Sequence, residues 1–188
     1  MSRLASIPIK IPSGLKVTLE KVEGINKLTI TNGKVTEMWS LHSAVNVEVT
    51  EDTGGDTGSE VAFSMSESDR ADKFSRSMLG TDYRHVSNLI TGMQTPFKTV
   101  LEIYGLGYRV KQAGNKLVLS LGKSHDDEVM IPENIQVEVP TEKEIVCTCH
   151  SKKLLGDFVA ELGSKRKPDA YKAKGVRIKG KHYRTKSD

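Results

Sequence analysis

The sequence predicts an α+β protein of two tandem, duplicated small domains, each an antiparallel β-sheet packed with one α-helix, plus a basic C-terminal extension. Three observations predict this fold. In each half of the chain, short segments that alternate apolar and polar residues precede one amphipathic helical pattern. The two halves share short sequence matches in the same order, and basic residues gather at the C-terminal end.

The first half begins with an extended arm, residues 1–13, because Pro8 and Pro12 exclude a helix or a central strand. The first domain, residues 14–97, follows. Strand patterns within it cover residues 15–19, 27–31, 35–41, 45–49 and 61–65. Asn32 and Gly33 predict a type I′ hairpin turn. The acidic, glycine-rich residues 51–59 predict an exposed loop.

One helix should close the first domain. It should begin near Ser68 or Asp69, since either side chain can cap a first turn, and run to about Leu79. The apolar pattern resumes at residues 82–93, so the same helix can continue past Gly80.

The second domain, residues 98–164, repeats this order of elements. Strand patterns cover residues 98–104, 116–121, 128–131, 135–139 and 144–149. A helix capped by Ser151 should follow and end at Gly163.

Short matches support duplication. Asn26-Lys27-Leu28 recurs 89 residues later as Asn115-Lys116-Leu117, and residues 45–49 match residues 135–139 at a displacement of 90. A chance match of so few residues is the alternative. The order of predicted elements supports one unit used twice more strongly than the identities do.

The basic character of the chain belongs to one end. Residues 165–188 hold ten Lys or Arg and two Asp, a net charge of +8, whereas residues 1–164 hold 18 bases and 22 acids, a net charge of −4. Like charges repel and cannot supply a core, so we expect an external polyanion as partner. Nucleic acid is the first candidate, because Lys and Arg bind phosphates and Tyr171 or Tyr183 can stack on bases. Gly175 and Gly180 would let the backbone turn and approach a phosphate. A solvated segment that only aids solubility is the alternative.

Other motifs do not indicate catalysis or a cofactor. Gly105-Leu106-Gly107 lacks the third glycine and the following helix of a dinucleotide fingerprint, which favours a tight turn. Cys147 and Cys149 with His150 match no zinc spacing, which favours strand packing. No set of residues specifies a nucleophile or general base, so we expect neither an enzyme nor a metal or other cofactor.

Composition also indicates the compartment. The two cysteines lie too close along a strand to form a disulfide, which indicates a reduced, intracellular protein. No apolar run has the length of a membrane span. We therefore expect a cytosolic protein with no membrane partner, or one in an organelle matrix.

The C-terminal motif resembles a known family. Residues 167–177, KPDAYKAKGVR, closely resemble the C-terminal signature of bacterial-type ribosomal protein six of the large subunit. Ser2-Arg3, the paired prolines, Gly105-x-Gly-Tyr-Arg109 and Leu119-Ser-Leu-Gly-x-Ser-His125 occur in the order of that family. The chain departs from the family at Ala173, where glycine is usual. A methyl group there disfavours positive φ.

This resemblance implies a structural constituent of the large ribosomal subunit, bound to 23S-type rRNA near the sarcin-ricin loop and stalk base. Partners would be rRNA, neighbouring ribosomal proteins and nearby translation factors. The resemblance and the charge together predict twelve RNA-binding residues: Lys165, Arg166, Lys167, Pro168, Tyr171, Lys172, Lys174, Gly175, Arg177, Lys179, Lys181 and Arg184. The alternatives are a non-ribosomal RNA-binding regulator and an RNA-processing enzyme with a basic substrate arm.

Overall fold

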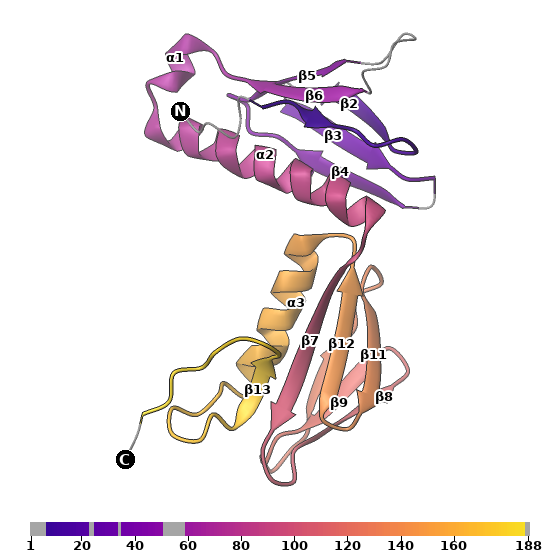
Figure 1. Cartoon of the computed structure of the whole chain (residues 1–188), viewed down its shortest axis with the longest axis vertical. Helices are drawn as coiled ribbons and strands as arrows, with labels where there is room; N and C mark the ends of the chain where they lie inside the picture. The colour runs from indigo at the N-terminus through magenta and orange to yellow at the C-terminus, as the bar shows by residue number, and fades with distance from the viewer. Residues whose placement is uncertain (1–6, 23–24, 34, 51–58, 187–188) are drawn as a thin grey trace. The chain divides into compact units, whose positions relative to one another are not determined.

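A computed structural model describes residues 7–22, 25–33, 35–50 and 59–186 (Figure 1). The chain divides into two compact units, Met1–Thr95 and Pro96–Asp188. Both units combine antiparallel sheets with a helix, which confirms the predicted fold class. Within the described residues, each unit has two small sheets rather than one.

The first unit contains two three-stranded antiparallel sheets. One has the order β1 (Ile9–Lys10), β6 (Glu60–Ser64), β5 (Asn46–Thr50), and the other β2 (Lys16–Val22), β3 (Ile25–Thr31), β4 (Thr36–Ser40). Helices α1 (Glu67–Arg70) and α2 (Lys73–Gln94) follow. Leu28, Ile30, Val45, Val61 and Val86 are fully buried and join the sheets to α2 in one core.

The predicted helix is two helices. The Ser66 side chain caps α1, and Asp72 caps α2 by accepting a hydrogen bond from Ser75 N at 2.8 Å. The predicted start near Ser68 lies within one residue of the start of α1, but neither Ser68 nor Asp69 is the cap, and the helix is not continuous because Asp72 begins a second one. Hydrogen bonds from Ser75 also hold the pKa of Asp72 below its ordinary value. The prediction that the helix continues past Gly80 is confirmed.

The hairpin after β3 lies where it was predicted. Beyond the pair Thr31 and Thr36, Asn32 N donates to Val35 O at 3.0 Å, and Gly33 has the expected positive φ, 57°, so a tight turn is confirmed. Asn32 Nδ2 also donates to Met93 O at 2.9 Å, which ties the turn to the end of α2. The predicted loop at residues 51–59 lies, except for Ser59, outside the described residues.

The second unit also contains two antiparallel sheets. One has the order β8 (Arg109–Ala113), β9 (Lys116–Ser120), β10 (Asp127–Met130), and the other β11 (Gln136–Thr141), β12 (Glu144–Cys149), β7 (Phe97–Tyr104), β13 (Gly175–Ile178). Helix α3 (Lys152–Lys165) packs against β7, β12 and β13.

Ser151 caps α3 as predicted, but the predicted end at Gly163 was wrong. The helix continues to Lys165, because Ser164 Oγ donates to Glu161 O at 2.7 Å and the Lys165 ammonium lies 3.8 Å from the Glu161 carboxylate. These contacts support a last helical turn that the glycine weakens.

The two units share one strand order. β1-β6-β5 in the first corresponds to β7-β12-β11 in the second, and β2-β3-β4 corresponds to β8-β9-β10. The second unit has one addition, β13, which pairs with the outer edge of β7. Figure 1 shows this strand beside β7, with the residues after it, 179–186, leading away from it. None of the helices that the structure describes is long and apolar enough to cross a membrane.

Candidate nucleic-acid interface

The C-terminal segment is built into the second unit. β13 runs antiparallel to β7 and places Val176 opposite Ile103. Val176 and Ala173 are both buried, although basic residues surround them in the sequence. The expectation that this charged block cannot contribute to a core was wrong, because its small apolar residues pack while its charges point elsewhere.

Between α3 and β13, residues 166–174 form a tight loop, which we call the basic loop. Asp169 N donates to Lys174 O at 3.0 Å, and Ala173 N donates to Asp169 O at 2.9 Å. The Asp169 carboxylate also accepts a hydrogen bond from Lys172 N at 3.3 Å. Asp169 therefore holds the loop in shape. Ala173 does adopt a positive φ, 51°, at the position where glycine is usual in the resembling family.

Gly175 is required by the packing of its own chain. Its φ is +147°, and an added Cβ would lie 2.7 Å from Arg166 O and 2.8 Å from Lys167 O. The next residue, Val176, donates its N–H to Arg166 O at 3.0 Å. Close approach of backbone to backbone therefore accounts for this glycine, where the sequence suggested approach to a phosphate.

The basic loop presents four cations to solvent. Arg166, Lys167, Lys172 and Lys174 are exposed, and within the described part of the chain none of their side chains forms an ion pair. Tyr171, 57% exposed, lies among them. Near the C-terminus, Lys186 N donates to Ala170 O at 2.8 Å, so the residues after β13 return to the basic loop. The loop thus combines unpaired cations with an available aromatic face.

Three other predicted residues have acidic partners within the chain. These are Lys165, Arg177 and Lys179. Lys165 pairs with Glu161. The Arg177 guanidinium lies 3.8 Å from Glu102 and 4.3 Å from the centre of the Tyr104 ring. Lys179 Nζ lies 2.9 Å from Glu144 and 3.8 Å from Glu102. The hydrogen bond to Glu144 raises the pKa of Lys179 above its ordinary value.

The remaining predicted residues flank the loop. Lys181 Nζ lies 5.7 Å from the centre of the Tyr183 ring, and the Tyr183 hydroxyl accepts a hydrogen bond from Ile178 N at 2.9 Å. Pro168 is half-buried and Arg184 is exposed. The twelve predicted residues therefore lie in one region, but they differ in exposure and in whether they have an acidic partner.

The other motifs take structural roles. Cys147 and Cys149 are buried in the second core, which confirms strand packing, and burial raises the pKa of the Cys147 thiol to about 12. Gly105 and Gly107 lie in the turn between β7 and β8, as predicted, and the Tyr108 ring occupies the space beside Gly105. Among the described residues, no group of His, Cys, Asp or Glu side chains could hold a metal ion.

Sequence reasoning missed the two carboxylates that anchor the segment. Glu144 lies directly opposite Glu102 across β12 and β7, and Glu102 lies opposite Arg177 across β7 and β13. No local motif marks these acids. Only the strand register, which joins residues far apart in the chain, reveals the cluster.

The fold and the basic loop define a class: a duplicated α+β protein that presents a cationic surface suited to a polyanion. A family model described as Ribosomal protein L6 matches residues 104–179. Large ribosomal subunit protein uL6 of Chromohalobacter salexigens is 38% identical over 186 residues, covering 99% of this chain and 97% of the relative. The same protein of Saccharophagus degradans matches equally, and that of Desulfitobacterium hafniense is 35% identical over 100% of this chain and 94% of the relative. The chain belongs to the ribosomal protein L6 family, which is a family of ribosomal proteins and not of enzymes.

Proposed function

We propose that this protein is a structural constituent of the large ribosomal subunit that binds 23S-type rRNA through its C-terminal segment. The observation that carries the proposal is the basic loop. Four exposed cations, which have no acidic partner among the residues that the structure describes, stand on a backbone that internal hydrogen bonds hold in shape. A polyanion with regularly spaced phosphates is the partner that such a surface fits.

The twelve predicted residues have different roles in this binding. Arg166, Lys167, Lys172 and Lys174 contact phosphates, and Arg can do so with two parallel hydrogen bonds. Tyr171 offers a face for an unstacked base. Pro168 and Gly175 shape the loop, while Lys165, Arg177 and Lys179 hold the segment through their carboxylate partners. Lys181 and Arg184 extend the cationic surface beyond β13.

The family resemblance supports a proposal for the place within the subunit. We propose a position near the sarcin-ricin loop and the stalk base, next to neighbouring ribosomal proteins and close to the translation factors that dock there. The protein would work in the cytoplasm, in the ribosome, or in an organelle matrix ribosome. As functional parts we propose an arm at residues 1–13, domains at 14–97 and 98–164, and a contact segment at 165–188.

Sedimentation of a cell extract at moderate and then high salt tests the assignment. The chain should co-migrate with large subunits and resist moderate salt. Recovery at the top of the gradient under both conditions would instead favour a free RNA-binding regulator or an enzyme acting on RNA.

Salt titration tests the basic loop itself. The double variant Lys172→Ala, Lys174→Ala should bind a 23S-type rRNA fragment more weakly and flatten the log–log salt dependence by about 1.5 units, since two phosphate contacts are lost. The control variant Lys111→Ala, Lys143→Ala removes two exposed lysines from the same unit and should change little. An equal effect of both variants would show that the basic loop contributes to rRNA binding no more than other surface lysines do.

A further inference from the structure

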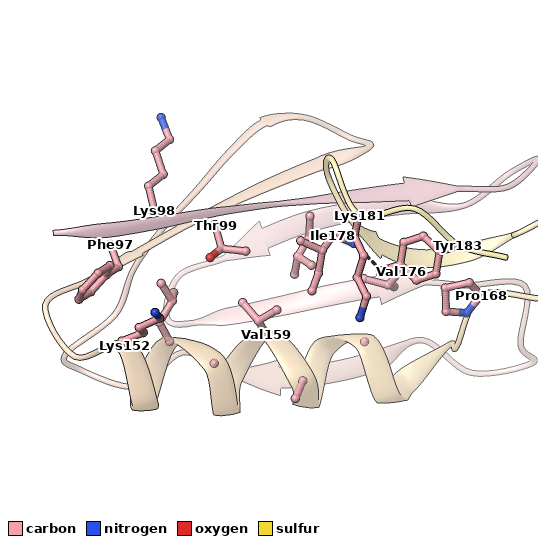
Figure 2. Close-up of a pocket in the computed structure, with 15 residues that line it drawn as sticks. Phe97, Lys98, Thr99, Lys152, Val159, Pro168, Val176, Ile178, Lys181 and Tyr183 are labelled. Atoms are coloured by element: carbon pink, nitrogen blue, oxygen red, sulfur yellow. Dashed lines mark hydrogen bonds between the residues drawn. The ribbon is translucent and has the colours of Figure 1, made fainter. Parts of the chain in front are cut away.

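A groove in the second unit lies between α3 and the strands β7 and β13 (Figure 2). Its volume is about 620 Å³. Aliphatic side chains form much of its surface, among them Leu101, Leu155, Val159, Val176 and Ile178. The four exposed cations of the basic loop are not among its lining residues. Pro168 and Lys181, which belong to the predicted RNA-binding residues, do line it. The groove is therefore a site separate from the four exposed cations of the basic loop.

The α3 wall of the groove includes three small residues, Gly156, Ala160 and Gly163, beside the larger Leu155 and Val159. An added Cβ at Gly156 or at Gly163 would meet nothing within 4 Å. Glycine inside a helix is destabilising relative to alanine, and no contact among the described residues requires it at these positions. The open space above both glycines leaves room for the backbone of another molecule.

Cations stand at both ends of the groove. Lys152 Nζ lies 5.8 Å from the centre of the Phe97 ring at one end, and Lys181 Nζ lies 5.7 Å from the Tyr183 ring at the other. Figure 2 shows these two pairs on either side of Val159. Lys98 is the third charged lining residue, and no acidic residue is among the described residues that line the groove.

We propose that this groove binds an extended segment of a partner protein that has aliphatic residues at its centre and acidic residues at both ends. The twelve residues from Lys152 to Gly163 on α3 span about 17 Å, which matches about five residues of extended chain. The aliphatic floor fits Leu, Val or Ile, and the lysines at the ends fit carboxylates. The proposal goes beyond rRNA binding and does not require it.

Single-stranded RNA fits this groove less well. A base on the aliphatic floor would leave its hydrogen-bonding groups without partners, which is unfavourable. The aromatic rings at both ends already lie beneath ammonium groups. The test below therefore also asks whether RNA, or a second copy of this chain, occupies the groove instead.

The test is an NMR titration of the isotope-labelled full chain with the heptapeptide Glu-Asp-Leu-Val-Leu-Asp-Glu. We expect saturable shifts at Phe97, Val159, Val176 and Lys181, and at least tenfold weaker binding of the peptide with Gln and Asn in place of its acids. Gly156→Leu should fill the groove and weaken binding at least tenfold, with Ala160→Leu as a second filling variant. Asp157→Leu adds the same side chain one residue away, outside the lining residues, and should bind normally.

Absence of saturable shifts, or equal binding by Gly156→Leu and Asp157→Leu, would overturn the proposal. Groove shifts caused by a single-stranded octaribonucleotide in place of the peptide, or a dimer that Gly156→Leu dissociates, would also overturn it. Because Gly156→Leu leaves the basic loop unchanged, its rRNA affinity should equal that of the unaltered chain. Failure of the groove proposal and failure of rRNA binding are thereby distinguishable.

Discussion

Lys179 Nζ lies 2.9 Å from Glu144 Oε1 and joins the end of β13 to β12, across the intervening strand β7. The contact resolves a conflict in the sheet. Glu144 and Glu102 lie directly opposite each other on β12 and β7, and like charges in that arrangement repel. Arg177 and Lys179 neutralise the pair, so the C-terminal segment and the sheet stabilise each other.

The variant Lys179→Met should therefore lower the thermal midpoint modestly, since the contact is partly exposed. Glu102→Gln added to it should restore part of the loss, because it removes the repulsion left behind. The pKa of Lys179 is raised above its ordinary 10.5. Its contribution should thus be fully present below about pH 10 and disappear as pH rises through the raised pKa. Thermal melts of both variants between pH 7 and 11 measure this, and a midpoint difference that stays constant across the range would contradict it.

Gly175→Ala should detach the basic loop from the sheet. The added Cβ would meet the carbonyl oxygens of Arg166 and Lys167 at 2.7 and 2.8 Å, and backbone atoms cannot move aside as a flexible side chain can. We expect a loss of about 2 kcal/mol or more in the free energy of unfolding, together with weaker rRNA binding.

Gly180→Ala is the matched control. Gly180 also has a positive φ, +82°, but an added Cβ there meets nothing within 4 Å. It should lose only about 1 kcal/mol from backbone strain. Denaturant unfolding compares the two variants, and equal losses would show that strain at φ alone, and not the close contact, explains Gly175.

Much of the fold could be predicted from hydrophobic periodicity. The alternation at residues 144–149 predicts β12 with the same limits, and the match between residues 45–49 and 135–139 corresponds to the equivalent strands β5 and β11. The element ends were less predictable, because specific hydrogen bonds decided them. Asp72 separates two helices, and Ser164 and Lys165 extend α3 past Gly163.

The site was predictable in composition but not in arrangement. The charge of residues 165–188 identified the segment, and the burial of Ala173 and Val176 did not follow from that charge. The acid partners of Lys179 lie 35 and 77 residues earlier in the chain, at Glu144 and Glu102. Strand register brings them together, and register depends on the packing of the whole sheet.

Cys147 should be nearly inert while the protein is folded. Burial raises the pKa of its thiol from 9.0 to about 12, so the thiolate population near pH 8 falls roughly 1000-fold. Alkylation by iodoacetamide at pH 8, followed by fragmentation mass spectrometry to separate it from Cys149, should therefore be far slower in the folded protein than in urea, because the thiolate is scarce and the side chain is also fully buried. A rate in the folded protein close to that of the unfolded chain would contradict this.

Ala173→Gly should change stability little, although φ at this position is 51°. An alanine in this left-handed region costs about 1–2 kcal/mol relative to glycine. Two effects offset this cost: the buried methyl group, 6% exposed, contributes about 0.8 kcal/mol, and alanine restricts the unfolded chain by about 0.4–1 kcal/mol. The net change should lie within about 1 kcal/mol, which explains how an alanine can occupy a position with positive φ. Ala173→Val keeps the apolar contact but places a β-branched residue at positive φ, so it should destabilise clearly more. Denaturant unfolding of both variants decides the point: a gain well above 1 kcal/mol for Ala173→Gly would mean that burial of the methyl group does not offset the strain.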